Sequence, residues 1–152
     1  MSLAQLVDTR NQWALDKKKV VFTNGCFDIL HFGHIHYLAD AADCGDKLVV
    51  GLNSDSSVKR LKGPTRPIND IMTRKLILAS LSFVDAVIIF EEETPLKLIH
   101  QVTPDVLVKG GDWNPLQIVG SDWVLQHGGK VQSLPFVKGY STTSIETKIK
   151  NS

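Results

Sequence analysis

The stretch "VFTNGCFDILHFGHIHYLAD", which covers residues 21–40, contains the change of pattern that decides the fold prediction. Its beginning belongs to the apolar run "VVFTN" (20–24), which is typical of a buried strand, whereas residues 34–43 have the spacing of a helix. Gly33 lies in the loop between them. A strand that leads through a glycine-containing loop into a helix brings free backbone N–H groups to one point. The stretch therefore predicts a phosphate site.

The same alternation of apolar runs and helical spacing continues along the chain. It predicts strands at 20–24, 47–52, 85–90, 105–109 and 130–135. It predicts an N-terminal helix that ends near the polar run 16–19, and helices at 34–43, 70–82, 94–102, 117–127 and 143–150. Residues 53–69 contain Gly63, Pro64 and Pro67 and are expected to form a long mobile loop. Strands separated by helices indicate a Rossmann-like α/β fold. We expect a five-stranded parallel sheet with helices on both faces, in a single domain over residues 1–152.

The composition argues against several classes of protein. The net charge of +1 provides no electrostatic basis for a nucleic-acid or membrane partner. The longest apolar runs, such as "AVIIF" (86–90), are too short to span a bilayer, and no secretion signal opens the chain. Cys26 and Cys44 are too few for a disulfide scaffold and are expected to be reduced thiols. These features predict a cytoplasmic protein.

Three stretches rich in polar and glycine residues follow the ends of predicted strands. They are "TNGCFDILHFGH" (23–34), "GLNSDSSVKRLKG" (51–63) and "VKGGDW" (108–113). In a parallel sheet the carboxyl ends of the strands lie at one edge, and ligands bind there. We therefore expect the three stretches to form one site.

His31, His34 and His36 raise the question of a metal site. Successive residues of a helix turn by about 100°, so His34 and His36 would point about 200° apart and cannot easily share an ion. His31 and His34 could share a face, but no acid or cysteine follows at a familiar ligand spacing, and no metal ligand is predicted. These two imidazoles can instead donate hydrogen bonds to charge that develops at phosphorus during a transfer. The alternative is that they fill polar gaps.

The segment "GCFDILHFGH" (25–34) resembles the His-x-Gly-His signature of a nucleotidyltransferase superfamily. That superfamily includes cytidylyltransferases, phosphopantetheine adenylyltransferase and, more distantly, class I aminoacyl-tRNA synthetases. Four further stretches resemble the adenylyltransferase domains of ADP-heptose synthases, so that the likeness covers nearly the whole chain from Lys19 onward. They are "GLNSDSSVKRLKGPTRPIN" (51–69), "FEEETPLKLI" (90–99), "PDVLVKGGDW" (104–113) and "GYSTTSI" (139–145). The sugar-kinase domain of the two-domain members is absent, which suggests a stand-alone adenylyltransferase.

The resemblance implies transfer of AMP from ATP to D-glycero-β-D-manno-heptose 1-phosphate, which yields ADP-heptose for lipopolysaccharide and pyrophosphate. It also implies Mg²⁺ with ATP, a sugar 1-phosphate as the second substrate and a homodimer as an assembly to test. Two alternatives stay open. One is a CTP-dependent cytidylyltransferase that acts on glycerol 3-phosphate or another small phosphate, and the other is a non-catalytic nucleotide-binding module. Phe136 disfavours glycerol 3-phosphate, because the cytidylyltransferase pattern has arginine at this position, five residues before Ser141.

The resemblance also implies roles for individual residues. His31 and His34 would hold the triphosphate and stabilise the transition state, and Lys62 would contact a phosphate from the basic cluster that it forms with Lys59 and Arg60. Lys109 is predicted to bind the phosphate of the acceptor. The nucleotide-binding residues would be Asn24, Gly25, Cys26, Phe27, Gly33, Arg74, Gly110, Asp112, Trp113, Ser141, Thr142 and Thr143.

Most of these roles have a structural alternative. Cys26 either offers its backbone N–H or is an inert core thiol, and Arg74 either faces the nucleotide or lies exposed on a helix. Asp112 can accept ribose hydroxyls and Trp113 can wall the base pocket, or both belong to a simple turn.

The remaining predictions concern capping and loop geometry. Thr143 and Glu146 can form an ordinary capping box, which is compatible with a phosphate nest at 141–143. Phe27 and Asp28 are expected to be architectural, with the Asp28 carboxylate accepting hydrogen bonds from loop amides.

Overall fold

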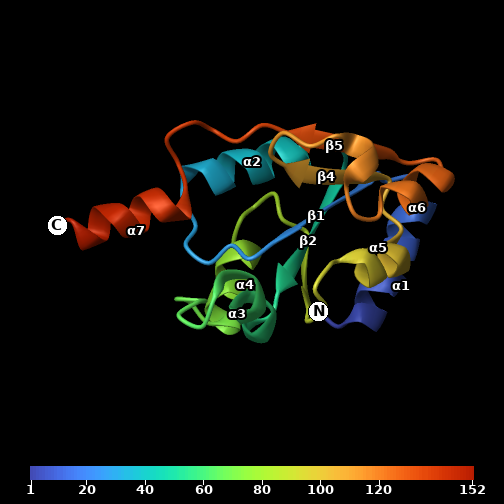
Figure 1. Cartoon of the computed structure of the whole chain (residues 1–152). Coiled ribbons are helices and arrows are strands. Elements are labelled where there is room, and N and C mark those ends of the chain that lie inside the picture. The colour runs from blue at the N-terminus through green and yellow to red at the C-terminus, as the bar shows by residue number, and fades with distance from the viewer.

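The computed structural model describes all 152 residues and contains one five-stranded parallel sheet. The strand order is β3-β2-β1-β4-β5 (Figure 1), which confirms the predicted α/β architecture. The strands are β1 (Val20–Gly25), β2 (Lys47–Asn53), β3 (Ala86–Phe90), β4 (Val106–Gly110) and β5 (Lys130–Leu134). In the central pairing, Val20 of β1 is opposite Lys47 of β2, and Val21 is opposite Val106 of β4. The order reverses between β1 and β4, which is where sheets of this type bind ligands.

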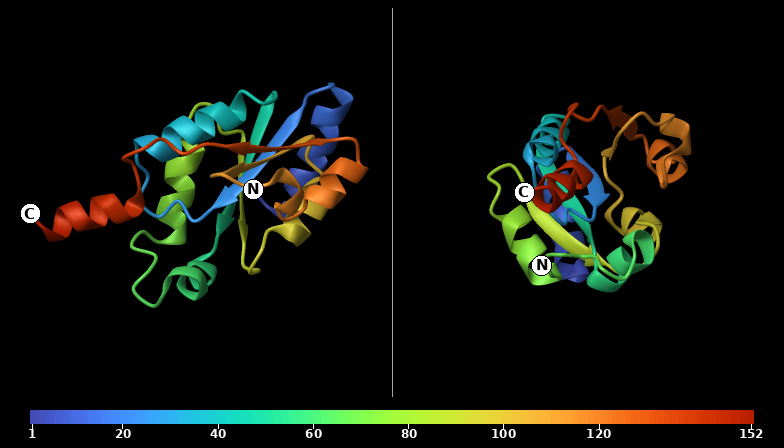
Figure 2. Two further views of the ribbon diagram at one scale, coloured as in Figure 1. Left: turned by 45° about the horizontal axis from the view of Figure 1, so that its top comes forward. Right: turned by 60° about the vertical axis from the view of Figure 1, so that its left-hand side comes forward.

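Helices cover both faces of the sheet (Figures 1 and 2). One face packs against α1 (Leu3–Leu15), α5 (Leu96–Val102) and α6 (Ser121–Gln126), and the other against α2 (Phe32–Ala42) and α4 (Ile71–Ala79). Along β1, Val20 and Phe22 belong to the first core and Val21 to the second, as the alternation of side chains in a strand requires. Burial on both faces explains why the central strands β1, β2 and β4 are mainly apolar.

The segment 53–69 differs from its prediction, because half of it is helical. Helix α3 (Asp55–Lys62) begins after Ser54, whose hydroxyl accepts a hydrogen bond from the backbone N–H of Ser57 at 3.2 Å. Val58 anchors the helix in the interior. The loop is therefore restricted to residues 63–70. The glycine and prolines that suggested a longer loop lie after the helix and end it.

Two other helices begin at different places than expected. The region 117–127 is divided into a short 3-10 helix, η1 (Pro115–Gln117), and α6, which are separated by Gly120 with a φ of 86°. The last helix, α7 (Thr142–Lys150), is capped by Ser141 together with Ser144. The capping box predicted for Thr143 and Glu146 is therefore wrong, because the serine two positions earlier takes the cap.

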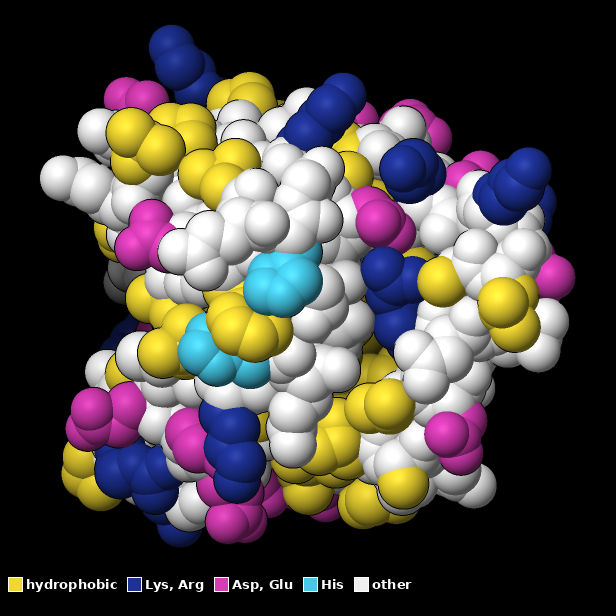
Figure 3. Space-filling view, turned by 90° about the vertical axis from the view of Figure 1, so that its right-hand side faces the viewer, with side chains coloured by type: hydrophobic (Ala, Val, Ile, Leu, Met, Phe, Trp, Pro, Cys, Tyr) yellow, Lys and Arg dark blue, Asp and Glu magenta, His cyan; other side chains and the backbone are white.

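The two ends of the molecule differ in character. The face that carries α1, α5 and α6 has side chains of both charge signs interspersed among apolar ones (Figure 3). No helix is long and apolar enough to cross a membrane. The stretches that the sequence singled out gather at the opposite end, where the strands finish and α7 begins (Figure 1).

Candidate active site

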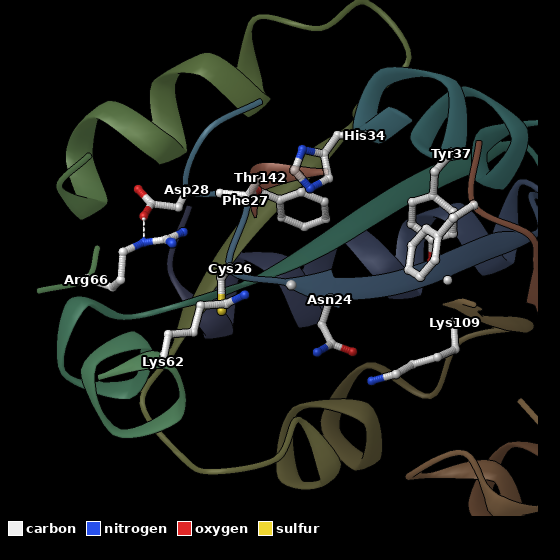
Figure 4. A pocket seen from close by; sticks show the side chains of 13 residues that line it. Asn24, Cys26, Phe27, Asp28, His34, Tyr37, Lys62, Arg66, Lys109 and Thr142 are labelled. Atoms are coloured by element: carbon white, nitrogen blue, oxygen red, sulfur yellow. Dashed lines mark hydrogen bonds and ion pairs between the residues drawn. The ribbon is translucent and has the colours of Figure 1, made fainter. Parts of the chain in front are cut away.

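A cavity of about 330 Å³ opens where β1 and β4 end (Figure 4). It brings together many of the predicted site residues from four separate segments of the chain: Asn24, Gly25, Cys26, Phe27, His34, Lys62, Lys109, Gly110 and Thr142. Lys62 and Lys109 enter from opposite sides, and their ammonium groups point toward Asn24 between them (Figure 4). The cavity is thus flanked by two cations, one from the end of α3 and one from the end of β4.

A second cavity of about 290 Å³ shares His34, Lys62 and Thr142 with the first. It adds the other predicted phosphate-binding positions, His31, Gly33, Ser141 and Thr143. Here the N-termini of α2 and α7 lie against the same space, so the free N–H groups and the positive dipole ends of two helices converge. The two cavities together form one groove that suits a polyanion.

The loop after β1 contains a residue with a left-handed backbone and a close contact that requires a glycine. Phe27 adopts a left-handed φ of 45° and is buried, with its ring edge-on to His34 at a centroid distance of 5.4 Å. A Cβ on Gly25 would stand 2.8 Å from the Phe27 ring, so the glycine permits this close approach. The loop thereby fixes the position of the His34 ring.

The rings of His31 and His34 are stacked, with centroids 3.9 Å apart. The Nδ1 atoms of both are buried and lack any hydrogen-bond partner. Burying a polar atom without a partner is costly, and such atoms gather where function requires them rather than where stability does. His36 points away from the groove, as the helical spacing predicted, and its Nδ1 lies 3.2 Å from Asp40 Oδ2.

The electrostatics of the pair follow from burial. Burial and, secondarily, the neighbouring His31 lower the pKa of His34 to about 4, and burial also lowers the pKa of His31. The His34 ring is consequently neutral at pH 7, and the lowered pKa of His31 also favours its neutral form. An anionic ligand would favour the protonated forms and shift both pKa values upward.

Asp28 organises the loop between α3 and α4, as predicted. Its carboxylate is almost completely buried and accepts hydrogen bonds from the backbone N–H groups of Ile68 and Asn69, each at 2.8 Å, and from Arg66 Nε at 2.6 Å. Burial alone would raise the pKa of Asp28. The backbone amides and the Arg66 guanidinium outweigh that effect and hold the pKa below its ordinary value.

Arg74, expected to face the nucleotide, lies outside both cavities and is fully buried. Its Nη1 donates to the carbonyl oxygens of Cys26 at 2.8 Å and Asn53 at 2.7 Å. Its Nε donates to the carbonyl of Asn69, and its Nη2 pairs with Asp55 at 2.7 Å. Arg74 thus ties the ends of β1 and β2 to the loop before α4. The sequence could not show this arrangement, because the position of an arginine on a helix does not reveal which carbonyl groups surround its side chain.

The Cys26 side chain behaves as an inert group. Burial raises the pKa of its thiol, although the positive charges of Lys62 and Arg74 act in the opposite direction. The thiol is therefore protonated at neutral pH.

The residues after β4 form the other wall of the groove. A Cβ on Gly110 would stand 2.7 Å from the ring of Phe136, so the ring lies directly across the glycine. Trp113 donates from Nε1 to the Gly110 carbonyl at 3.1 Å, and its half-exposed ring lies 5.3 Å from Lys109 Nζ. Asp112 lines a more open cavity of about 370 Å³ that also borders Phe136.

Comparison with known proteins identifies this arrangement. The cytidylyltransferase-like family model matches residues 22–147, which include most of β1, the histidine pair, the basic end of α3 and the start of α7. The chain belongs to the cytidylyltransferase-like family.

Relatives of this cytidylyltransferase-like chain include proteins named bifunctional protein HldE. Those from Histophilus somni and Campylobacter concisus are 56% and 59% identical to it over 87% and 89% of its length. The matches take in only 28% of each relative, so the chain spans less than a third of their length.

Solved structures agree with the fold. The lipopolysaccharide core biosynthesis protein of Thermoplasma volcanium is 30% identical, with a TM-score of 0.66 over 82% of this chain and 99% of that protein. Pantothenate synthetase of Thermus thermophilus is 17% identical with a TM-score of 0.64, covering 99% of this chain and 69% of that protein, which is a likeness of fold alone.

Several groove residues of this cytidylyltransferase-like chain were not among the predicted site residues, and Tyr37 and Phe136 are two of them. Tyr37 lies one turn after His34 on α2, and its hydroxyl is 2.6 Å from Thr23 Oγ1, while burial raises the pKa of Tyr37 to about 12. The i, i+3 spacing from His34 is a signal that could have found it. Phe136 borders all three cavities, but its place beside Gly110 depends on the pairing of β4 with β5.

Proposed function

We propose that this chain is an adenylyltransferase that moves AMP from ATP to D-glycero-β-D-manno-heptose 1-phosphate and releases pyrophosphate. The family, the similarity to HldE proteins and the likeness to a lipopolysaccharide core biosynthesis protein support this class of reaction. One observation carries the proposal: the stacked rings of His31 and His34 line a groove that is also bounded by Lys62 and Thr142. The proposal extends to a cytoplasmic location and a homodimer.

The groove suggests where each part of the substrates binds. The triphosphate would lie along His31, His34 and Lys62, over the N-termini of α2 and α7. The nucleoside would extend toward Phe136 and Asp112, where an aromatic ring and a carboxylate suit a base and a ribose. Lys109, on the opposite side from Lys62, would then hold the acceptor phosphate.

The reaction requires no protein nucleophile. A phosphate oxygen of the sugar 1-phosphate forms a bond to the α-phosphorus of ATP, and the bond from that phosphorus to the α,β-bridging oxygen breaks. Its electron pair leaves with pyrophosphate. The protein contributes by aligning the two substrates and by placing N–H donors and ammonium groups around the oxygens on which charge develops.

A divalent ion would enter with the nucleotide. No three His, Cys, Asp or Glu side chains gather in a group able to hold a metal, and the Asp28 carboxylate is already occupied by Arg66 and two amides. Mg²⁺ would therefore be held mainly by phosphate oxygens, where it would neutralise part of their charge.

A pyrophosphate-release assay tests the proposal. Purified protein is supplied with ATP, CTP or GTP, and with heptose 1-phosphate, another sugar 1-phosphate or glycerol 3-phosphate. Release that requires both ATP and heptose 1-phosphate, and that falls in the His34→Ala variant, supports the adenylyltransferase. Preference for CTP and glycerol 3-phosphate would support the cytidylyltransferase alternative, and nucleotide binding without any turnover would support the non-catalytic module.

A further inference from the structure

Arg66 joins three segments of the chain that each contribute a group to the groove. Its Nε donates to Asp28 at 2.6 Å, in the loop that leads to His34 (Figure 4), and its Nη1 pairs with Glu146 on α7 at 2.5 Å. Arg66 itself lies in the loop after α3, the helix that ends with Lys62. The Arg66 side chain is only 13% exposed, so this ion pair is screened less than one on the surface.

The attachment of α7 to the rest of the protein depends strongly on this ion pair. The helix has nine residues, none of them buried, and it extends away from the sheet in both Figures 1 and 2. No other hydrogen bond or ion pair joins its side chains to the rest of the chain. A helix this short is marginal without tertiary contacts, so its single polar link has a large influence on where it lies.

We infer that the Arg66–Glu146 ion pair positions the N-terminus of α7 over the phosphate groove. Glu146 is one helical turn after Thr142, which lines both main cavities. With Glu146 held by Arg66, Thr142 and the first N–H groups of α7 stay opposite His34 and Lys62. Arg66 and Glu146 are thus positioning residues for the nucleotide. The inference rests on the proposed function.

ATP affinity measured by calorimetry tests the inference without any acceptor. Glu146→Gln keeps the shape of the side chain and removes its charge, and we expect it to weaken ATP binding about three- to tenfold. The thermal midpoint and the Michaelis constant for the acceptor should stay unchanged, whereas a merely structural role would move the midpoint. Asp8→Asn is the matched control, because Asp8 is an exposed acid on α1 without a partner.

A double-mutant cycle separates positioning from a direct electrostatic effect. If Glu146 acts through the start of α7, its replacement should cost much less ATP affinity in a Thr142→Val background than alone. Equal losses of ATP affinity in both backgrounds, or an unchanged ATP affinity in Glu146→Gln, would overturn the inference. The proposed function would still be supported in that case if the wild type transferred AMP. Failure of the wild type to bind ATP would instead refute the proposed function.

Discussion

His31 and His34 stack with their ring centroids 3.9 Å apart, and Gly33, which directly precedes His34, leaves room for the His31 ring. A Cβ on Gly33 would stand 3.0 Å from two atoms of the His31 ring and 3.1 Å from the Cβ of Tyr140. Only the absence of a side chain lets the His31 ring lie over the start of α2 beside the ring of His34. The glycine of the His-x-Gly-His motif thus has a steric role, in addition to the chemical role of the two histidines.

Replacement of either stacked histidine by alanine should lower turnover by about 10²-fold, as the loss of a transition-state donor does. The fold should persist, since neither Nδ1 atom supports another part of the protein. His36→Ala is the control, because that ring pairs with Asp40 on the outer side of α2. Steady-state kinetics and a melting curve check both points. Near-normal turnover in His31→Ala or His34→Ala would contradict the phosphate role.

The stability of the empty protein should depend on pH through His34. Its pKa is about 4 in the folded state and about 6.5 when unfolded, so the unfolded chain binds more protons in this window. Stability should therefore fall as the pH drops from about 6.5 toward 4, and should not change through this group above 6.5. Melting temperatures of the wild type and His34→Asn over this range check the prediction. An equal slope of melting temperature against pH in both proteins would show that groups other than His34 are responsible.

Lys62 should matter far more than Lys59, although both belong to the basic end of α3. Lys62 borders both main cavities, whereas Lys59 is exposed and borders neither. We expect Lys62→Ala to reduce catalytic efficiency at least tenfold and Lys59→Ala to leave it within about twofold. Kinetics with varied ATP distinguish the two. Similar losses of catalytic efficiency in both variants would indicate that the basic cluster attracts ATP through its overall charge, and that Lys62 makes no specific contact with a phosphate.

The central strands were predictable because β1, β2 and β4 are buried on both faces and therefore appear as apolar runs, as "VVFTN" does. Helix α3 was missed for a local reason. Its start signals, Ser54 and Asp55, are followed by only one fully buried apolar anchor, Val58, and by the strong breakers at 63–67.

The site was predictable where function depends on a contiguous motif, as for His31, Gly33 and His34, which the fold brings to one groove. It was less predictable where the role depends on distant partners. Arg74 is surrounded by carbonyls from three other segments, and Phe136 reaches Gly110 only through strand pairing. A residue type and a family resemblance cannot supply those partners, because they are set by tertiary packing.

The choice of base should depend on Phe136. We expect ATP to exceed CTP more than tenfold in catalytic efficiency, a difference of about 1.4 kcal/mol or more. The Phe136 ring borders all three cavities and offers a face against which the larger purine can stack. Phe136→Arg, which restores the arginine of the cytidylyltransferase pattern, should narrow the ratio. Equal use of both nucleotides by the wild type would refute the adenylyltransferase proposal and leave the family unchanged.

Lys109 should serve the acceptor rather than the nucleotide. Its ammonium group enters the groove opposite Lys62 (Figure 4) and lies beside the Trp113 ring. Lys109→Met keeps the length of the side chain and removes the charge. We expect the Michaelis constant for heptose 1-phosphate to rise about tenfold, because a dianionic phosphate loses its cation, while the ATP affinity measured by calorimetry changes little.

Lys130→Met is the control for that variant. Lys130 is an exposed lysine at the start of β5, at the edge of the sheet opposite to Lys109. It should leave both substrates unaffected, so that any effect of Lys109→Met cannot be attributed to the overall charge of the protein. If Lys109→Met instead lost ATP affinity and kept its normal dependence on the acceptor, Lys109 would belong to the triphosphate site. The acceptor phosphate would then have to bind elsewhere in the groove, and Arg66, which also lines it, would be the next cation to replace.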